Sequence, residues 1–350
     1  IATAQGDIAS MQRGGSSADV WVVTPPEQAV DTTTLLAPHH SPATLAHSKR
    51  IVTSRAAEHL FWLGRYTERA ENSLRLSRLT LDCLNGDRRS SVPLLTWLGQ
   101  MASNNVLVQS EVPMPAQRRR VFERSLVASL ANTAISGSVG YNLNCIKQSA
   151  FAVRERLSEE HWKVIVHAQE EFFRRCAEYQ SEGNYQTLDA LRVLETTSGY
   201  LAAITGAQAD RMTRDDGWRL LSIGRHIERL GFLAAALEQG FRTESVHDAS
   251  GFEAMIALFD STITFHAQYQ QSHDVVALLD LLVMDRDNPR SLGWVAQTLR
   301  GRLARLAGSA PGELAALSLN VPNPDLWDLE DLCRTEMEHP PEPAPTTEQA

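Results

Sequence analysis

The sequence predicts an all-α protein, a multi-helix bundle of two pseudo-symmetric halves that follows a short N-terminal β or loop segment. Apolar residues recur at helical spacing over most of the chain beyond residue 50. A helical motif, Leu-Gly-Arg-Tyr-Thr-Glu-Arg at 63–69, returns at 223–229 as Ile-Gly-Arg-His-Ile-Glu-Arg. This period is too long for a solenoid, so we expect two related halves packed about a pseudo-twofold axis.

Composition limits the class of protein. A chain of 350 residues can bury a full core, and its 43% apolar and 21% charged residues are typical of a globular protein. No apolar run approaches the length needed to cross a bilayer, so we expect a soluble protein without a membrane partner. The net charge of −9 argues against general binding to nucleic acid. Four cysteines without Cys-x-x-Cys spacing favour a reducing cytoplasm.

The two ends of the chain differ from the rest. Residues 1–23 contain a Gly14-Gly15 turn followed by Ser-Ser-Ala-Asp-Val-Trp-Val-Val, which predicts a short β-segment. Residues 24–51 are rich in Pro, Thr, Ala and His without periodicity and are expected to be a linker. The Pro-rich stretch 336–350 predicts a disordered tail. Because the chain begins with Ile1 and lacks a signal layout, we expect it to be cut from a longer protein.

Periodicity and capping residues place helices along residues 52–335. We expect them near 54–85, 93–102, 116–135, 138–157, 159–181, 185–205, 214–242, 250–271, 273–285, 289–307 and 311–318. Ser158 marks the start of one helix. Asn288 followed by Pro289 predicts another start, because Asn caps free amides and Pro has no N–H to lose.

The repeated helix is expected to be buried on two sides. In the first copy, apolar residues oppose the charged group Arg65, Glu68, Arg69 and Asn72. In the second copy, Arg225, Glu228 and Arg229 form the charged group. Both charged faces also carry large apolar residues, and a helix that is apolar on both sides is usually buried on both.

Two interpretations of the charged faces remain open. In the first, Arg65, Glu68, Arg69, Arg225, Glu228 and Arg229 surround a central cavity for an anionic or peptide-like ligand. Glu68 and Glu228 would then be paired carboxylates for proton transfer, as catalytic residues. In the second, the same groups form a buried ion-pair network that fixes how two helices cross. Gly64 and Gly224 favour close helix approach under both interpretations.

Other chemistry has little support in the sequence. Both Glu-x-x-His spacings, at Glu244/His247 and Glu336/His339, fall outside predicted core helices, so we expect no di-iron or other metal site. Walker, Gly-x-Ser-x-Gly and dinucleotide-binding motifs are missing. His226 is either a site residue or a packed polar neighbour.

Residues 54–72 closely resemble the opening of the bacterial alpha-E domain family. Later family motifs are similar to residues 217–229, 260–269 and 287–292, so the resemblance spans about 52–335. It implies an all-helical partner domain in which Asn72, Arg154, Asn288 and Arg290 join the repeated arginines as ligand-binding residues. The chain departs from the family where Gln148-Ser149-Ala150-Phe151 replaces Glu-Asn-Ala-Arg, and at Val166 and His266. These departures favour a structural or regulatory role.

Residues 10–22 are similar to the last segment of circularly permuted ATP-grasp domains. That resemblance implies a bacterial system for ATP-dependent amide-bond formation or peptide modification, with an ATP-grasp ligase domain as partner, fused or in trans. Arg13, Gly14 and Gly15 would be cofactor-binding residues, whereas ATP and Mg would belong to the missing ATP-grasp portion. Ala18 stands where this segment usually carries lysine.

Three functions follow as hypotheses. The first is a scaffold or ligand-binding partner domain of an ATP-grasp ligase, acting on a peptide-like small molecule. The second is an independent acid–base or transferase enzyme that uses Glu68 and Glu228 and needs a carboxyl group with a raised pKa beside a cavity. The third is a structural protein-interaction module, which a homo-oligomer covering the motif helices would favour.

Overall fold

The computed structural model describes residues 52–86, 90–181, 186–270, 273–308 and 314–334, together with two strands of two residues each. The chain divides into two compact units, Ile1–Arg50 and Ile51–Ala350. In the first unit, β1 (Ala2–Thr3) pairs antiparallel with β2 (Ser16–Ser17), at the start of the predicted β-segment. The rest of that segment, Arg13, Gly14, Gly15, the predicted linker and the predicted tail lie outside the described residues.

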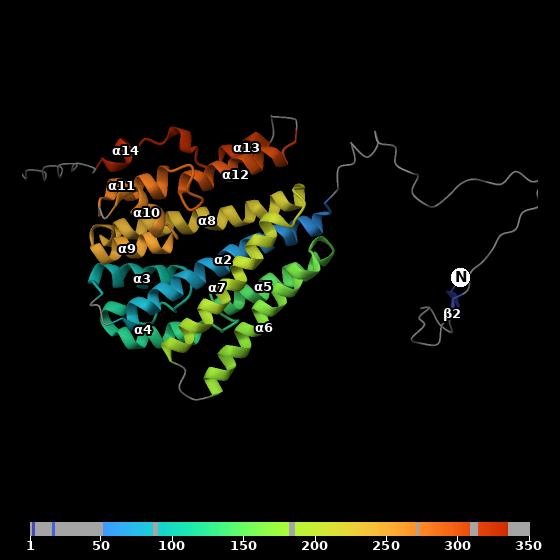
Figure 1. The fold of residues 1–350 in the computed structure, drawn as a ribbon, viewed down its shortest axis with the longest axis horizontal. Coiled ribbons are helices and arrows are strands. Elements are labelled where there is room, and N and C mark those ends of the chain that lie inside the picture. The colour runs from blue at the N-terminus through green and yellow to red at the C-terminus, as the bar shows by residue number, and fades with distance from the viewer. Residues whose placement is uncertain are drawn as a thin grey trace, which may run out of the picture. The chain divides into compact units, whose positions relative to one another are not determined.

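Every regular secondary-structure element in the described part of the second unit is a helix, which confirms the predicted all-α class (Figure 1). Large apolar side chains of several helices, among them Trp97, Phe122, Phe172 and Phe252, are fully buried in a shared core. The helices are α2 (Ser54–Asn85), α3 (Val92–Asn104), α4 (Pro115–Ser129), α5 (Val139–Ala152), α6 (Glu159–Ser181), α7 (Thr187–Asp210), α8 (Asp216–Arg242), α9 (Ala249–Leu258), α10 (Thr262–Tyr269), α11 (Val275–Leu279), α12 (Leu292–Leu306), α13 (Leu314–Leu319) and α14 (Leu329–Cys333).

The two copies of the repeated motif form the central helix pair. Helix α2 packs along α8, and each has further helices on its outer side: α5 and α7 on α2, and α12 on α8 (Figure 1). At the crossing, a Cβ on Gly64 would collide with the carbonyl oxygen of Leu221, and a Cβ on Gly224 with that of Phe61. The two collisions are related by the same 160-residue offset as the motif. Glycine is therefore required at both places by the close approach of the two backbones.

Two predicted helices agree with the structure at both ends. Helix α2 begins after Thr53, whose side chain accepts a hydrogen bond from the Ala56 N–H, and it runs over the predicted 54–85. Helix α6 covers the predicted 159–181, and the Ser158 hydroxyl accepts from the His161 N–H at 3.2 Å. Local capping by hydroxyl side chains is therefore enough to locate these helix starts.

The predicted helix 250–271 is wrong, because the chain forms two helices there. Helix α9 ends in a left-handed residue, Asp260 at φ 55°, and the Ser261 N–H bonds back to the Ile256 carbonyl. The Asp260 N–H bonds to Ala257, which completes a Schellman motif. This motif usually carries glycine, so its sequence signal is missing here.

The predicted start of the last long helix at Asn288 and Pro289 is also wrong. Helix α12 begins at Leu292, and the Ser291 hydroxyl accepts from the Trp294 N–H at 3.0 Å. Asn288 is buried and donates instead to the Ser261 hydroxyl and the Leu281 carbonyl, both at 3.2 Å. Its side-chain oxygen, the atom that an N-cap would use, accepts from the Arg290 N–H at 3.0 Å inside the turn that precedes α12.

Other predicted boundaries differ at one end. Helix α4 ends at Ser129 rather than 135, and α5 ends at Ala152, followed by the single turn η2 (Arg154–Arg156). Helix α7 continues to Asp210 rather than 205. The predicted helix 273–285 is α11 followed by a π-helical turn, η4 (Asp280–Met284). Short turns η3 (Ser245–His247) and η5 (Pro324–Leu326) complete the described elements.

Candidate functional site

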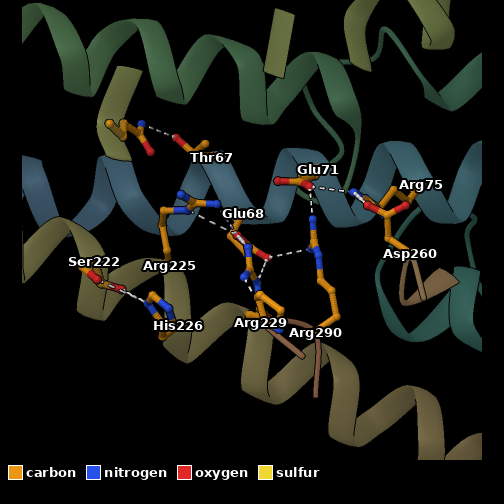
Figure 2. A network of polar contacts seen from close by, with 12 residues as sticks. Thr67, Glu68, Glu71, Arg75, Ser222, Arg225, His226, Arg229, Asp260 and Arg290 are labelled. Carbon is orange, nitrogen blue, oxygen red and sulfur yellow. Dashed lines mark hydrogen bonds and ion pairs between the residues drawn. The ribbon is translucent and has the colours of Figure 1, made fainter. Parts of the chain in front are cut away.

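The crossing of α2 and α8 brings the repeated charges together as reciprocal ion pairs. Glu68 of α2 accepts hydrogen bonds from Arg225 and Arg229 of α8 (Figure 2). Glu228 of α8 accepts from the corresponding arginines of α2, Arg65 at 2.7 Å and Arg69 at 2.5 Å. Each glutamate therefore binds both arginines of the other helix, as the pseudo-twofold relation requires.

The Glu68 half of this network is closed. The Glu68 side chain is fully buried, and Arg229 binds it through two hydrogen bonds of 2.6 and 2.8 Å. Arg225 donates to it at 3.2 Å, and Arg290 lies 3.7 Å away (Figure 2). Three guanidinium groups thus surround one carboxylate, an arrangement that replaces its lost hydration.

Further ion pairs extend the Glu68 half. Arg290 pairs with Glu71 at 2.6 Å, and Arg75 pairs with both Glu71 and Asp260 at 3.0 Å (Figure 2). We call Glu71, Arg75, Asp260 and Arg290 the charged quartet. It contains two positive and two negative groups, so it adds no net charge beside Glu68.

Electrostatics keep Glu68 ionised. Burial alone raises the pKa of this carboxyl group, but the charges of Arg229 and Arg225 outweigh burial and hold the pKa far below its usual value. The pKa of Glu71 is also lowered: burial and the Glu68 charge raise it, and Arg290 and Arg75 outweigh them. Glu68 is therefore a permanent anion at physiological pH and a poor proton carrier.

The Glu228 half is more open. The Glu228 side chain keeps 16% of its exposure, and the side chains of Arg65 and Arg69 keep 26% and 31%. The Arg65 guanidinium lies 5.0 Å from the Trp62 ring centre, which restricts its position through a cation–π contact. Two cations face Glu228, whereas three surround Glu68.

A cavity of about 320 Å³, lined by both polar and apolar residues, adjoins the Glu228 half. Asn72 in its lining is only 7% exposed and makes no hydrogen bond to any described residue. The Asn72 amide is not closed off like a core group and keeps access to this cavity, where water or a polar ligand can satisfy it. We call this space the Glu228 cavity; its lining residues are Arg69, Asn72, Ser73, Asn104, Asn105, Val106, Ser136, Gly137, Glu228, Gly231, Phe232 and Ala235.

These findings change the predicted site. The six repeated charged groups are paired with one another across the helix crossing, so they do not surround an open central cavity. Of the six, Arg69 and Glu228 line the Glu228 cavity, together with the predicted Asn72. Two larger cavities, of about 970 and 730 Å³, lie near the C-terminal end of α2, and none of the six lines either.

The remaining predicted ligand-binding residues have other partners. Arg290 belongs to the closed Glu68 half, and Asn288 anchors the turn before α12. Arg154 donates to the Leu157 carbonyl at 3.0 Å and lies over the Trp162 ring, so its contacts are with the start of α6. The sequence interpretation missed Glu71, Arg75 and Asp260; the spacing of Glu71 and Arg75, four residues apart on one helix, was the available signal.

His226 is a packed neighbour of the network. Its Nδ1 donates to the Ser222 carbonyl at 2.6 Å (Figure 2). Its ring lies against the Trp294 ring, with 5.6 Å between the ring centres. Burial and the nearby charge of Arg229 lower its pKa to about 3, so the ring is neutral at physiological pH. The described part of the chain holds no cluster of three or more His, Cys, Asp or Glu side chains suited to a metal ion. Nor does any helix within the described ranges have the length and apolar character to cross a membrane.

The fold and the site define an all-helical domain whose two halves meet through reciprocal Glu–Arg pairs on related helices. The chain belongs to the Alpha-E family, described as a predicted α-helical domain with a conserved ER motif, which matches residues 52–323. The Glu-Arg pairs at 68–69 and 228–229 fit that description. The predicted family membership is therefore confirmed.

The curated relatives are longer proteins. Uncharacterized proteins of Mycobacterium bovis and of Mycobacterium tuberculosis strains CDC 1551 and H37Rv are each 29% identical over 327 residues. These alignments cover 88% of this chain but 36% of each relative, so the chain spans about a third of their length. No solved structure matches the chain significantly.

Proposed function

We propose that this chain is a helical partner domain of an ATP-grasp ligase-type protein in peptide or amide-bond metabolism. In this proposal it binds an anionic or peptide-like ligand in the Glu228 cavity. The observation that carries the proposal is the side-chain amide of Asn72, which faces a cavity beside Arg69 and Glu228 and makes no hydrogen bond to a described residue. An amide offers both a donor and an acceptor, as a peptide or carboxylate ligand requires.

The two halves of the network have separate roles in this proposal. The closed Glu68 half holds the α2–α8 crossing, since its charges are buried and satisfied within the protein. The open Glu228 half supplies recognition, because Arg69 and Glu228 keep part of their exposure. This division joins the structural and the ligand-binding interpretations of the repeated motif.

The partnership with an ATP-grasp ligase depends on the similarity of residues 10–22 to such domains. Arg13, Gly14 and Gly15 would then contribute to the nucleotide site of the partner, while ATP and Mg bind outside this chain. The greater length of the curated relatives leaves room for such a portion. A cytoplasmic location follows from the need for ATP.

The acid–base enzyme is less favoured. That hypothesis needs a carboxyl group with a raised pKa beside a cavity, and the pKa of Glu68 is shifted the other way by Arg229 and Arg225. Glu68 is also fully buried and lines none of the three cavities described above. Glu68 is therefore unsuited to proton transfer, and the proposed pair of carboxylates is reduced to Glu228.

The binding proposal is tested with Asn72→Leu, which should fold because Phe232, an apolar residue, stands at the matching place of α8. Native mass spectrometry of the chain with a mixture of short peptides and carboxylates should detect a ligand that Asn72→Leu weakens at least tenfold. Asn320→Leu at an exposed position is the matched control. Equal binding by the Asn72 variant and the control would reject this site.

The partnership has a separate test. An ATP-grasp protein from the same organism, assayed for peptide-dependent ADP release, should be stimulated by the added chain and not by Asn72→Leu. Stimulation that does not depend on a peptide would instead favour the structural interaction module.

A further inference from the structure

The Glu228 cavity lies where the charged quartet lies in the other half of the molecule. The offset of 160 residues that relates α2 to α8 matches Glu71 with Gly231 and Arg75 with Ala235. Both replacements line the Glu228 cavity. Two ion-pairing side chains of the first half are therefore reduced to a hydrogen atom and a methyl group in the second.

A second match comes from the turns that precede α5 and α12. Ser138 and Ser291 cap these helices in the same way, each accepting from the N–H three residues later at 3.0 Å. Each hydroxyl also donates to the carbonyl six residues earlier, at Asn132 and Asp285. The residue before the cap is Arg290 in the turn that precedes α12 and Gly137 in the turn that precedes α5. Gly137 therefore stands in the place of Arg290, and it lines the Glu228 cavity.

A third match comes from the ends of α3 and α9. Val106 and Asp260 both follow the last helical turn with φ 55°. The N–H of the next residue bonds back five residues in both cases, Leu107 to Ala102 and Ser261 to Ile256. Val106 therefore stands in the place of Asp260, and it also lines the cavity.

All four members of the charged quartet are thus replaced by small or apolar residues that line one cavity. In the Glu68 half the quartet forms a continuous chain of ion pairs, from Asp260 through Arg75 and Glu71 to Arg290. In the Glu228 half the corresponding positions leave a space of about 320 Å³. The Glu228 half therefore lacks two cationic and two anionic side chains that the Glu68 half has.

Polar residues have replaced apolar ones around the same cavity. Asn72 and Ser73 stand where α8 has Phe232 and Leu233. Both are more than nine-tenths buried, and neither makes a hydrogen bond to a described residue. Empty cavities are usually apolar, whereas Asn72 and Ser73 place an amide and a hydroxyl in the wall of this cavity, where a polar ligand or water can bind them.

We propose that the Glu228 cavity binds a zwitterionic molecule of dipeptide size, with an ammonium group near Glu228 and a carboxylate near Arg69. The ligand takes the place of the charged quartet, in which Arg290 lies 3.7 Å from Glu68 and the negative charge of Glu71 acts on Arg229, the counterpart of Arg69. This inference deepens the proposed function, on which it rests, by naming the class of its ligand. A free amino acid or dipeptide has both charges, and a simple anion has one.

The first experiment measures the need for both charges. Calorimetric titration of the full chain uses L-alanyl-L-alanine, N-acetyl-L-alanyl-L-alanine and L-alanyl-L-alanine amide, with a panel of further free dipeptides of different side chains. At least one free dipeptide should bind, and its acetylated and amidated forms should each bind about tenfold more weakly or less. Equal affinity of the acetylated form, or no binding by any free dipeptide, would overturn the inference.

The second experiment rebuilds part of the quartet with Gly231→Glu and Ala235→Arg. A Cβ on Gly231 meets no atom within 4 Å, so the double variant should fold, with an unfolding temperature equal to or above that of the unchanged chain. It should lose dipeptide binding at least tenfold. The control is Gly199→Glu with Ala203→Arg, the same pair at the same spacing on an exposed face of α7, where a Cβ on Gly199 also meets nothing within 4 Å. Full binding by the folded rebuilt variant would contradict the inference.

The two proposals fail in different ways. If succinate or the acetylated dipeptide binds as well as the free dipeptide, and the rebuilt variant blocks that binding, the cavity has an anionic ligand and only the zwitterion is rejected. If neither class binds, and the rebuilt variant still stimulates peptide-dependent ADP release, ligand binding in the Glu228 cavity and the zwitterion are both rejected, while the partnership with the ligase stands.

Discussion

At the scale of single residues, Glu68 is a buried charge that holds two helices together through ion pairs. Its side chain is shielded from solvent, so the negative charge is stabilised by Arg225, Arg229 and Arg290. Removing one partner from a buried ion pair leaves the others uncompensated and commonly costs about 3–5 kcal/mol. Glu228 is partly exposed and faces two arginines, so water can take over part of its role.

We therefore expect Glu68→Gln to lower the free energy of unfolding by about 3–5 kcal/mol, and Glu228→Gln to lower it much less. Urea unfolding followed by circular dichroism measures both. Since glutamine has nearly the same shape, the comparison isolates the charge. Equal losses for the two variants would show that burial does not decide the strength of these pairs.

Two buried histidines predict an unusual dependence of stability on pH. The pKa of His226 is lowered to about 3 by burial and Arg229, and that of His161 to about 4 by burial and Arg211. Below pH 6.5 the unfolded chain binds protons at both rings and the folded chain does not. Their contribution to stability is therefore complete above pH 6.5 and is lost as the pH falls toward 4 and 3.

We expect the free energy of unfolding to fall between pH 6.5 and 4.5 with a slope of up to about 1.4 kcal/mol per pH unit for each ring. His161→Asn and His226→Asn should each reduce that slope. His167→Asn, at an exposed position of α6, is the control and should leave it unchanged. Urea midpoints measured at several pH values test this, and an unchanged slope in both buried variants would contradict it.

At the scale of elements, the contact between α2 and α8 depends on two glycines. Gly64 meets the Leu221 carbonyl, and Gly224 meets the Phe61 carbonyl, so neither position has room for a methyl group. The loss of helix propensity at each glycine, about 1 kcal/mol relative to alanine, is offset by the close packing that glycine permits. The same close approach brings the arginines of each helix within reach of the glutamate of the other.

We expect Gly64→Ala and Gly224→Ala to destabilise the protein by about 1–3 kcal/mol, as overpacking does. Gly231→Ala should instead stabilise it by up to about 1 kcal/mol, because it lies on the same helix as Gly224 in open space. Thermal unfolding of the three variants checks the opposite signs. A stabilising Gly224→Ala would show that the two helices separate easily.

Helix ends show which local signals are reliable. Ser158 was identified correctly as a helix start because its hydroxyl bonds to the first turn of its own helix. Asn288 was misidentified because its side-chain oxygen accepts from the Arg290 N–H within the turn before α12, while its NH2 group donates to the distant residues Ser261 and Leu281. The break between α9 and α10 could not be predicted because aspartate, and not the usual glycine, occupies the left-handed position at Asp260.

At the scale of the whole molecule, two related halves share the same backbone arrangement at their helix ends but differ in the side chains packed between the helices. Equivalent helix ends and caps recur in both halves, as the pairs Val106 and Asp260 and Ser138 and Ser291 show. The first half is filled by its own ion pairs, whereas the second has a cavity in their place. In our proposal, this asymmetry is what converts one half of a structural repeat into a binding site.

The amino-acid sequence by itself determined the helical class, the two halves, the family and the residues of the repeated motif. These depend on periodicity and short motifs, which are properties of neighbouring residues. Only the tertiary structure decided that the repeated charges pair with one another, that Glu68 is closed while Glu228 is open, and that Asn72 lies in a cavity. The physical reason is that burial and pairing depend on residues 60 to 220 positions apart, such as Arg229 with Pro289 and Arg290 with Glu71, whose approach no local pattern records.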